Sequence, residues 1–192
     1  PPPRMPRQPP VSRLPSPASL TGPLGAHVST AGGLTSCVPR AKAIGATAMQ
    51  IFTKQANQWK EPGVTPDDRT TFLETLAATE VVVSNAHDSY LINLGSPDPV
   101  LWHRSLISFI SELRRCELLQ LTYLVSHPGN FMDDRASGIA RNAEAISIAL
   151  AVVPGRTTLL METTAGSGTA IGANFEEMAF LLHLLRPGEL ML

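Results

Sequence analysis

The sequence has few cysteines, few charges and no long apolar run, and each shortage excludes a class of protein. Its 2 cysteines in 192 residues, Cys37 and Cys116, have no paired spacing, which excludes a disulfide scaffold and is typical of a reducing compartment. No apolar run approaches the roughly 18 residues that a membrane span requires, so no membrane partner is expected. With 16% charged and 43% hydrophobic residues, general disorder is excluded. We therefore expect an intracellular folded protein, in a compartment that the sequence does not identify.

Acidic residues are absent from the first 60 positions. Glu61 is the first of the 16 carboxylates, whereas lysines and arginines occur on both sides of it. Such a basic segment favours a polyanionic partner. Residues 1–22 are dominated by proline, arginine and serine, which predicts a disordered leader. The leader lacks acids as transit peptides do, but its prolines oppose an amphipathic helix. We predict a leader over 1–22 and one folded domain over 23–192.

From residue 24 onward, short apolar runs alternate with segments of helical periodicity. Strands are predicted at 24–29, 47–53, 80–87, 121–129 and 157–166, helices at 35–46, 65–79, 97–120, 137–153 and 174–185, and the start of a sixth strand at 188–192. This alternation predicts an α/β protein with a parallel sheet, either doubly wound or an incomplete (β/α)₈ barrel of about five βα units. Because the strands are apolar nearly throughout, burial of both sheet faces is expected.

Some local features within these elements carry their own predictions. Thr65 and Pro66 are expected to be the N-cap and first residue of a helix. Pro39 is expected to kink or delay the helix that contains it. The run Val81–Val83 is expected to form a buried strand. Arg114 and Arg115, near a helix C-terminus, are expected to compensate the helix dipole.

Polar side chains follow several of the predicted strands. His27, His87, His127 and Glu162 each come directly after an apolar run. In a barrel the carboxyl ends of all strands open onto one face, so His87, His127 and Glu162 should converge there. Two imidazoles and a carboxylate make a plausible zinc site with an open position for water or substrate. Taken singly, a histidine at a strand end is more often a hydrogen-bonded loop residue than a metal ligand.

The remaining candidates have simpler interpretations beside the functional ones. His103 and His183 lie within predicted helices and are expected at the surface. The glycine-rich stretch 165–172 precedes a helix but matches no phosphate-binding motif, so a tight connection is expected. Tyr90 and Leu91 are either core residues or loop residues beside the metal face, where they would wedge against stacked bases.

Five stretches resemble one known family. In their order and spacing these stretches resemble endonuclease IV: GAHVSTAGGL, QIFTKQANQW, HDSYLINLGSP, HPGN and METTAGSGT. The resemblance runs from about Leu24 to Leu192. It implies a TIM-barrel apurinic/apyrimidinic endonuclease of base excision repair with three Zn²⁺ ions. Such an enzyme cleaves duplex DNA on the 5′ side of an abasic site, giving a 3′-hydroxyl and a 5′-deoxyribose phosphate. A complete member is expected to be a monomer.

The resemblance also implies a role for each matching residue. His87 and His127 resemble ligands of the first zinc, and Glu162 resembles the catalytic carboxylate that bridges the first and second zincs. A metal-bound hydroxide would attack the phosphorus. Tyr90 and Leu91 resemble loop residues that enter the minor groove. Asn57 stands where some members carry an inserting arginine, and it lacks the charge and length of that residue.

The end of the sequence departs from the family pattern. The other zinc ligands of the family follow the sixth strand, and Leu192 lies inside that predicted strand. All protein ligands are therefore present only for the first zinc. Five strands and a fraction cannot close a barrel of eight, which leaves two unpaired edges and an open interior face. We expect a fragment, a truncated gene model or a degenerate copy, and we predict that the chain as printed is unstable or inactive.

Two other functions stay open on the sequence alone. Metal-dependent sugar isomerases and epimerases of similar architecture also use histidine and carboxylate ligands at strand ends. A non-catalytic remnant that associates with DNA is the third reading. Incision of abasic duplex, as opposed to turnover of a ketose, would separate the first two.

Overall fold

The structure is a computed structural model that describes residues 22–185. The predicted leader, apart from Gly22, and the predicted sixth strand lie outside these residues. All five predicted strands and all five predicted helices are present within them. The strands are β1 (Gly25–His27), β2 (Ala48–Phe52), β3 (Val83–His87), β4 (Tyr123–Ser126) and β5 (Thr158–Met161). The helices are α1 (Cys37–Ala43) after the short 3₁₀ helix η2 (Leu34–Ser36), then α2 (Pro66–Ala77), α3 (Pro99–Leu119), α4 (Arg135–Val152) and α5 (Phe175–Leu184).

The order of the strands decides between the two predicted architectures. The five strands form one sheet in the order β1-β2-β3-β4-β5, and every neighbouring pair is parallel. A doubly wound sheet reverses its order at a switch point, and this sheet has no reversal among the described residues. Successive helices pack against each other, α1 on α2, α2 on α3, α3 on α4 and α4 on α5. Strands in sequential order, each followed by a helix that packs on the next helix, are the arrangement of a (β/α)₈ barrel. The described residues form part of such a barrel.

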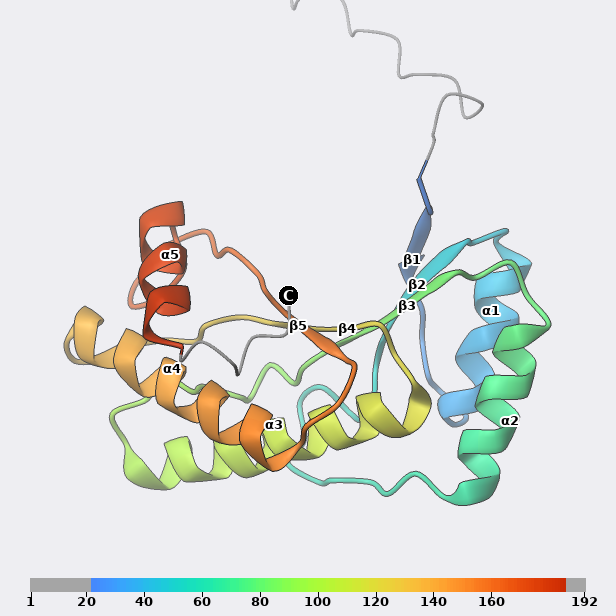
Figure 1. Cartoon of the computed structure of the whole chain (residues 1–192), viewed down its shortest axis with the longest axis horizontal. Coiled ribbons are helices and arrows are strands. Elements are labelled where there is room, and N and C mark those ends of the chain that lie inside the picture. Colours follow the sequence, from blue (N-terminus) through green and yellow to red (C-terminus); the bar gives the residue numbers. More distant parts are fainter. Residues whose placement is uncertain (1–21, 186–192) are drawn as a thin grey trace, which may run out of the picture.

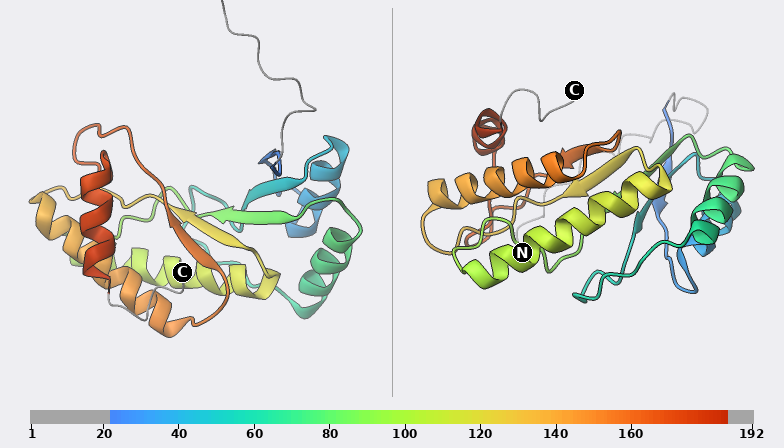
Figure 2. Two further views of the ribbon diagram at one scale, coloured as in Figure 1. Left: turned by 45° about the horizontal axis from the view of Figure 1, so that its top comes forward. Right: turned by 60° about the horizontal axis from the view of Figure 1, so that its bottom comes forward.

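Figure 1 shows that the sheet is curved and that α1 to α4 follow it on one side. The two further views in Figure 2 show α3 and α4 side by side next to the strands. The buried strand residues alternate with a period of two, as in Met49, Ile51, Ser84 and Ala86. This period is expected for a sheet that buries one face.

The predicted burial of both sheet faces is wrong for the described residues. The other face of the sheet is half-buried or exposed, and Leu160 of β5 is 40% exposed. Val82 was expected inside a buried strand, but it is 71% exposed and β3 begins one residue later. Val82 is exposed because it lies before the strand begins. Leu160 is exposed because, among the described residues, only the helix side of the sheet is covered. The apolar inner residues face the interior that additional barrel strands would enclose.

The helix ends follow the local chemistry of the sequence. Thr65 is the N-cap of α2 and forms a capping box with Asp68, as its position before Pro66 predicts. Asp134 caps α4 by accepting a hydrogen bond from the amide of Ser137 at 2.9 Å. Pro39 lies in the first turn of α1, where no intrahelical donor is needed, and η2 precedes that turn. The predicted delay of this helix is therefore confirmed.

The core lies between the sheet and the helices. Its largest fully buried side chains include Phe72 of α2, Phe109 of α3 and Ile146 of α4, packed beneath Met49 and Leu124 of the strands. None of the helices between residues 22 and 185 combines the length and the apolar character that crossing a bilayer requires.

Candidate metal centre

The register of the sheet brings His87, His127 and Glu162 to one place. His87, the last residue of β3, pairs with Val125, and Ser126 pairs with Met161. The next residues along the two strands, His127 and Glu162, therefore lie beside each other. The amide of Glu162 donates a hydrogen bond of 2.9 Å to the carbonyl of Ser126, which continues the pairing of β4 with β5. His87 lies two positions earlier in the register. Because side chains alternate along a strand, all three point to the inner face at the carboxyl end of the sheet.

The three side chains meet as the sequence predicts. Their ligand atoms all lie within 4.8 Å of one another. Oε2 of Glu162 is 3.3 Å from Nε2 of His87 and 3.9 Å from Nε2 of His127. Ligands about 2.0–2.1 Å from a tetrahedral ion stand about 3.4 Å apart, so a small closing movement would fit a zinc-sized ion. The donor set and its spacing therefore suit a divalent metal.

The orientation of His87 is set by its own backbone neighbourhood. Its Nδ1 lies 2.9 Å from the backbone carbonyl of Asp88, which assigns the proton to Nδ1. Nε2 is then free as an acceptor, and it is the nitrogen that faces Glu162. Fixing the tautomer by a hydrogen bond to a carbonyl is the usual support for a metal-binding histidine. His87 is 6% exposed, so this geometry is held by packing as well.

Asp88 is part of this support and was not singled out from the sequence. Its carboxylate accepts a hydrogen bond from the hydroxyl of Ser126 at 2.5 Å and lies 3.5 Å from Nδ1 of His87. Burial raises the pKa of the Asp88 carboxyl well above its usual range, although the Ser126 hydroxyl opposes this effect. The signal for Asp88 was its place directly after His87 in the HDSY stretch.

Aromatic rings continue from the metal centre toward β1. The ring centroids of His87 and His127 are 5.2 Å apart, and Phe52 lies 5.8 Å from His87. Phe52 also contacts Tyr90 at 5.2 Å and His27 at 4.4 Å. These tilted and edge-on contacts are favourable ring geometries. Burial and the nearby His87 lower the pKa of His27, which keeps its imidazole neutral near pH 7.

Two clefts open beside Tyr90. One, of about 390 Å³, contains His87, His127 and the start of the loop after β5. The other, of about 590 Å³, is lined by the loops after β1 and β2 and includes Asn57. Tyr90 lines both clefts and is 69% exposed, as expected for a loop residue and not for a core residue. Leu91 is half-buried and lines neither cleft.

The loop after His127 depends on two asparagines. Asn142 of α4 is fully buried, and its Nδ2 donates to the carbonyl of Pro128 at 2.7 Å. Oδ1 of Asn93 accepts hydrogen bonds from the amides of Asn130 at 2.8 Å and Gly95 at 3.2 Å. Gly129 lies between these anchors with a φ of 84°. The loop that presents His127 is therefore held on both sides.

Replacing Gly129 with alanine is expected to destabilise the protein by about 1–3 kcal/mol. A Cβ at this position would lie 2.3 Å from Oδ1 of Asn93, and the backbone conformation is unfavourable for alanine. Urea unfolding followed by circular dichroism measures the change. Gly63→Ala is the matched control, because nothing lies within 4 Å of its added Cβ and its φ is not in the positive range. Equal stability of the two variants would contradict the assigned role of Gly129.

His103, His183 and the two cysteines lie away from the metal centre. His103 and His183 are exposed on α3 and α5, as predicted. Burial raises the pKa of Cys37 to about 11 and raises that of Cys116 further. Both thiols are buried and stay protonated near neutral pH, so they do not compete as metal ligands.

Known proteins resemble this chain in sequence and in structure. The model of the xylose isomerase-like TIM barrel family matches residues 38–188. A protein named probable endonuclease 4 from Chloroflexus aurantiacus is 42% identical over 163 residues, which cover 84% of this chain and 57% of the relative. A protein of the same name from Chlorobium luteolum is 42% identical over 165 residues, which cover 84% of this chain and 59% of the relative. The chain therefore spans less than two thirds of the length of these relatives.

Solved structures agree with the sequence matches. Endonuclease IV from Thermus thermophilus superposes with a TM-score of 0.74 at 33% identity, over 85% of this chain and 61% of that one. A D-tagatose 3-epimerase-like protein superposes with a TM-score of 0.64 at 15% identity, over 83% and 60%, which shows the shared fold alone. The predicted barrel architecture and the predicted resemblance are both confirmed. The chain belongs to the xylose isomerase-like TIM barrel family, and within that family it resembles endonuclease IV.

Proposed function

We propose that this protein acts in base excision repair as a zinc-dependent endonuclease that hydrolyses duplex DNA on the 5′ side of an abasic site. The observation that carries the proposal is the meeting of His87, His127 and Glu162 within 4.8 Å, in a chain 42% identical to a probable endonuclease 4. The products would be a 3′-hydroxyl and a 5′-deoxyribose phosphate. The sugar epimerases share the fold at low identity, and no residue contact described above favours their chemistry.

His87, His127 and Glu162 are the side chains that would hold the first zinc ion. Both histidines face the same carboxylate oxygen, Oε2 of Glu162, and the resemblance to endonuclease IV implies that this carboxylate would also contact a second ion. Bound zinc would supply Lewis acidity that stabilises charge developing on the phosphate oxygens. Asp88 keeps His87 in the correct tautomer through its backbone carbonyl.

The clefts on either side of Tyr90 would receive the DNA. Tyr90 is exposed between them, and Asn57 lines the cleft farther from the metal ligands. A flat exposed ring at this place can stack on a base or enter the gap left by a missing one. Asn57 can donate and accept hydrogen bonds but cannot neutralise a phosphate. Leu91 is half-buried and has less exposed surface to offer, so we assign it a smaller share of the contact with DNA.

An incision assay with a completed chain tests this function. Residues 22–185 are joined to the part of the Chloroflexus relative that the match does not cover, and the zinc-loaded chimera is given a duplex with one tetrahydrofuran abasic site. We expect a single cut whose 3′ end a DNA polymerase extends without prior phosphatase treatment. Glu162→Gln should reduce the rate by at least about 100-fold, as expected for a group that supports the metal and the reaction.

The matched control is Glu144→Gln, an exposed carboxylate on α4 far from the inner face. It should cut at the rate of the parent chimera. Incision that survives Glu162→Gln would contradict the assignment of the metal centre. A chimera that epimerises a ketose and leaves abasic duplex intact would favour the sugar-enzyme reading instead.

A further inference from the structure

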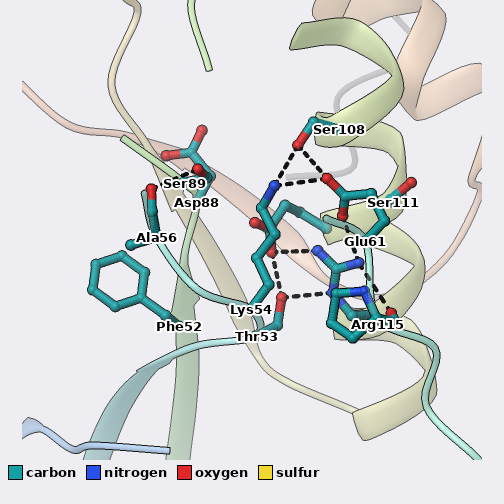
Figure 3. A network of polar contacts seen from close by, with 12 residues as sticks. Phe52, Thr53, Lys54, Ala56, Glu61, Asp88, Ser89, Ser108, Ser111 and Arg115 are labelled. Carbon is teal, nitrogen blue, oxygen red and sulfur yellow. Dashed lines mark hydrogen bonds and ion pairs between the residues drawn. The ribbon is translucent and has the colours of Figure 1, made fainter. Parts of the chain in front are cut away.

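A buried ionic network lies beside the loop that carries Asn57. Lys54 donates to Oε1 of Glu61 at 2.6 Å, and Arg115 of α3 donates to Oε2 of the same carboxylate at 2.8 Å. The Lys54 and Arg115 side chains are 1% and 4% exposed. Figure 3 shows the ammonium of Lys54 and the guanidinium of Arg115 both pointing at the carboxylate of Glu61. The two ends of the loop, residues 54–61, are thus joined to each other and to α3.

Hydroxyl groups complete this network. Ser108 of α3 accepts from Lys54 at 2.8 Å and donates to Glu61 at 2.7 Å. Thr53 accepts from Nε of Arg115 at 2.8 Å and donates to the buried carboxylate of Glu112. Burial alone would raise the pKa of Glu61, but hydrogen bonds from Lys54, Ser108 and Arg115 lower it below its usual value. Glu61 therefore stays ionised at neutral pH, and its two oxygens keep their partners.

The network also reaches Tyr90, through the backbone of residues 54–61. The carbonyl of Ala56 accepts a hydrogen bond from the amide of Tyr90 at 3.0 Å and another from the hydroxyl of Ser89 at 2.7 Å. Trp59 of the same loop lies under Arg104 of α3, whose Cζ is 4.5 Å from the ring centroid. Residues 54–61 and 88–90 consequently form one connected unit that is fixed to α3.

We propose that Lys54, Glu61 and Arg115 are positioning residues that hold Asn57 and Tyr90 in the arrangement used for binding abasic DNA. This inference rests on the proposed function. A buried ion pair contributes little net stability compared with apolar packing. Its best-supported role is to select one conformation of the surrounding chain over others. Fixing the loop before binding removes the cost of ordering Asn57 and Tyr90 when DNA arrives. Lys54 lines the cleft that Asn57 and Tyr90 also line, whereas Glu61 and Arg115 line neither cleft and contact none of the three metal ligands.

The test uses Glu61→Gln in the full 192-residue chain. The variant keeps the size of the side chain but removes the charge that Lys54 and Arg115 share. Trp59 reports on the loop in a Trp102→Phe background, because the chain has two tryptophans. We expect acrylamide to quench Trp59 more strongly in the variant. We also expect the Kd for a tetrahydrofuran-containing duplex to rise about tenfold, since two side chains then have to be ordered on binding.

Zinc affinity separates positioning from general damage, and it should stay unchanged in Glu61→Gln. Asp133→Asn is the matched control, because it removes an ion pair of the same 2.6 Å length, to Arg141, elsewhere in the molecule. Ser108→Ala is measured alongside as a milder variant that leaves the Lys54–Glu61 pair in place. In Ser108→Ala the quenching of Trp59 and the Kd for the abasic duplex should both rise, but by less than in Glu61→Gln. This variant keeps the proposal testable even if Glu61→Gln fails to fold.

The possible results lead to different conclusions. Unchanged quenching and an unchanged Kd in both variants would overturn the proposal. Increased quenching with an unchanged Kd would show that the network holds the loop but does not position it for DNA, which also overturns it. A parent chain that binds abasic and intact duplex equally would refute the proposed function itself. In that case the Trp59 reading would still show whether the network orders the loop.

Discussion

Replacing Glu162 with glutamine is expected to weaken zinc binding by the 192-residue chain about 100-fold or more. Glutamine keeps the size of the side chain but removes the negative charge from the oxygen that faces both imidazoles. Loss even of groups that only support a metal ligand costs about 10–100-fold in affinity, so loss of the anionic ligand should cost at least as much. His87→Ala and His127→Ala should have effects of the same order, because the three donors share one position.

Competition with a chromophoric zinc chelator measures these affinities and the stoichiometry, which we expect to be one tightly bound ion per chain. Thermal unfolding gives an independent reading, because an ion at 100 times its Kd stabilises the folded state by about 2.7 kcal/mol. This stabilisation should disappear in the three variants. In Glu162→Gln and His127→Ala, loss of binding should not be accompanied by loss of helical circular dichroism, since the two side chains are 48% and 41% exposed.

The chain supplies its own controls for this experiment. His103→Ala and His183→Ala remove exposed imidazoles from α3 and α5, and they should leave zinc affinity unchanged. The two cysteines are buried and should not bind the ion. If either control variant lost as much affinity as Glu162→Gln, the zinc would be bound elsewhere. The convergence of His87, His127 and Glu162 would then be a hydrogen-bonded cluster without a metal.

The site was predictable because the fold repeats one geometric rule. Each of its three side chains follows an apolar strand, and parallel strands bring their carboxyl ends to a common edge. That rule requires no knowledge of side-chain contacts, so His87, His127 and Glu162 could be grouped from their positions alone. The choice between a barrel and a doubly wound sheet could not be made in this way. It depends on strand order, which the alternation of strands and helices leaves open.

Burial was harder to predict, because hydrophobicity does not show which surface is covered. Val82 is as apolar as its neighbours, yet it is exposed, and the inner face of β5 is only partly covered by the described residues. Leu91 and Tyr90 are adjacent in sequence, yet Tyr90 is exposed and Leu91 is half-buried. The amide of Tyr90 also donates to the carbonyl of Ala56, and the sequence does not show that these two loops are neighbours.

Arg115 shows most clearly where sequence reasoning was wrong. Two adjacent arginines near a helix end were expected to compensate the helix dipole, but only Arg114 is exposed. Arg115 is 3% exposed and contacts Glu61, Glu112 and Thr53. The helical phase places residue 115 on the same side of α3 as Glu112 and Ser108, three and seven positions earlier. Glu112, an acidic residue at the spacing of the buried apolar residues of α3, was the signal that a buried partner was needed.

Arg115→Ala is accordingly expected to destabilise the folded chain by about 3–5 kcal/mol, the usual cost of removing one partner from a buried ion pair. The substitution leaves Glu112, which is 1% exposed, without its cation and removes one of the two cations that contact Glu61. A loss of this size is a large part of the roughly 5–15 kcal/mol typical of a domain. Urea unfolding should show a marked fall in the midpoint, or an unfolded variant where the margin is small.

Arg114→Ala is the matched control, one residue away on the same helix, and it should change stability by less than about 0.5 kcal/mol. The dipole interpretation predicts similar small effects for both substitutions, because both side chains lie at a similar distance from the helix end. Two equal and small losses would therefore restore that interpretation. Arg115→Lys refines the comparison, because lysine keeps the charge but cannot bond Glu61 and Thr53 together. An intermediate loss in this variant would show that the fork of the guanidinium, and not its charge alone, joins α3 to the loop.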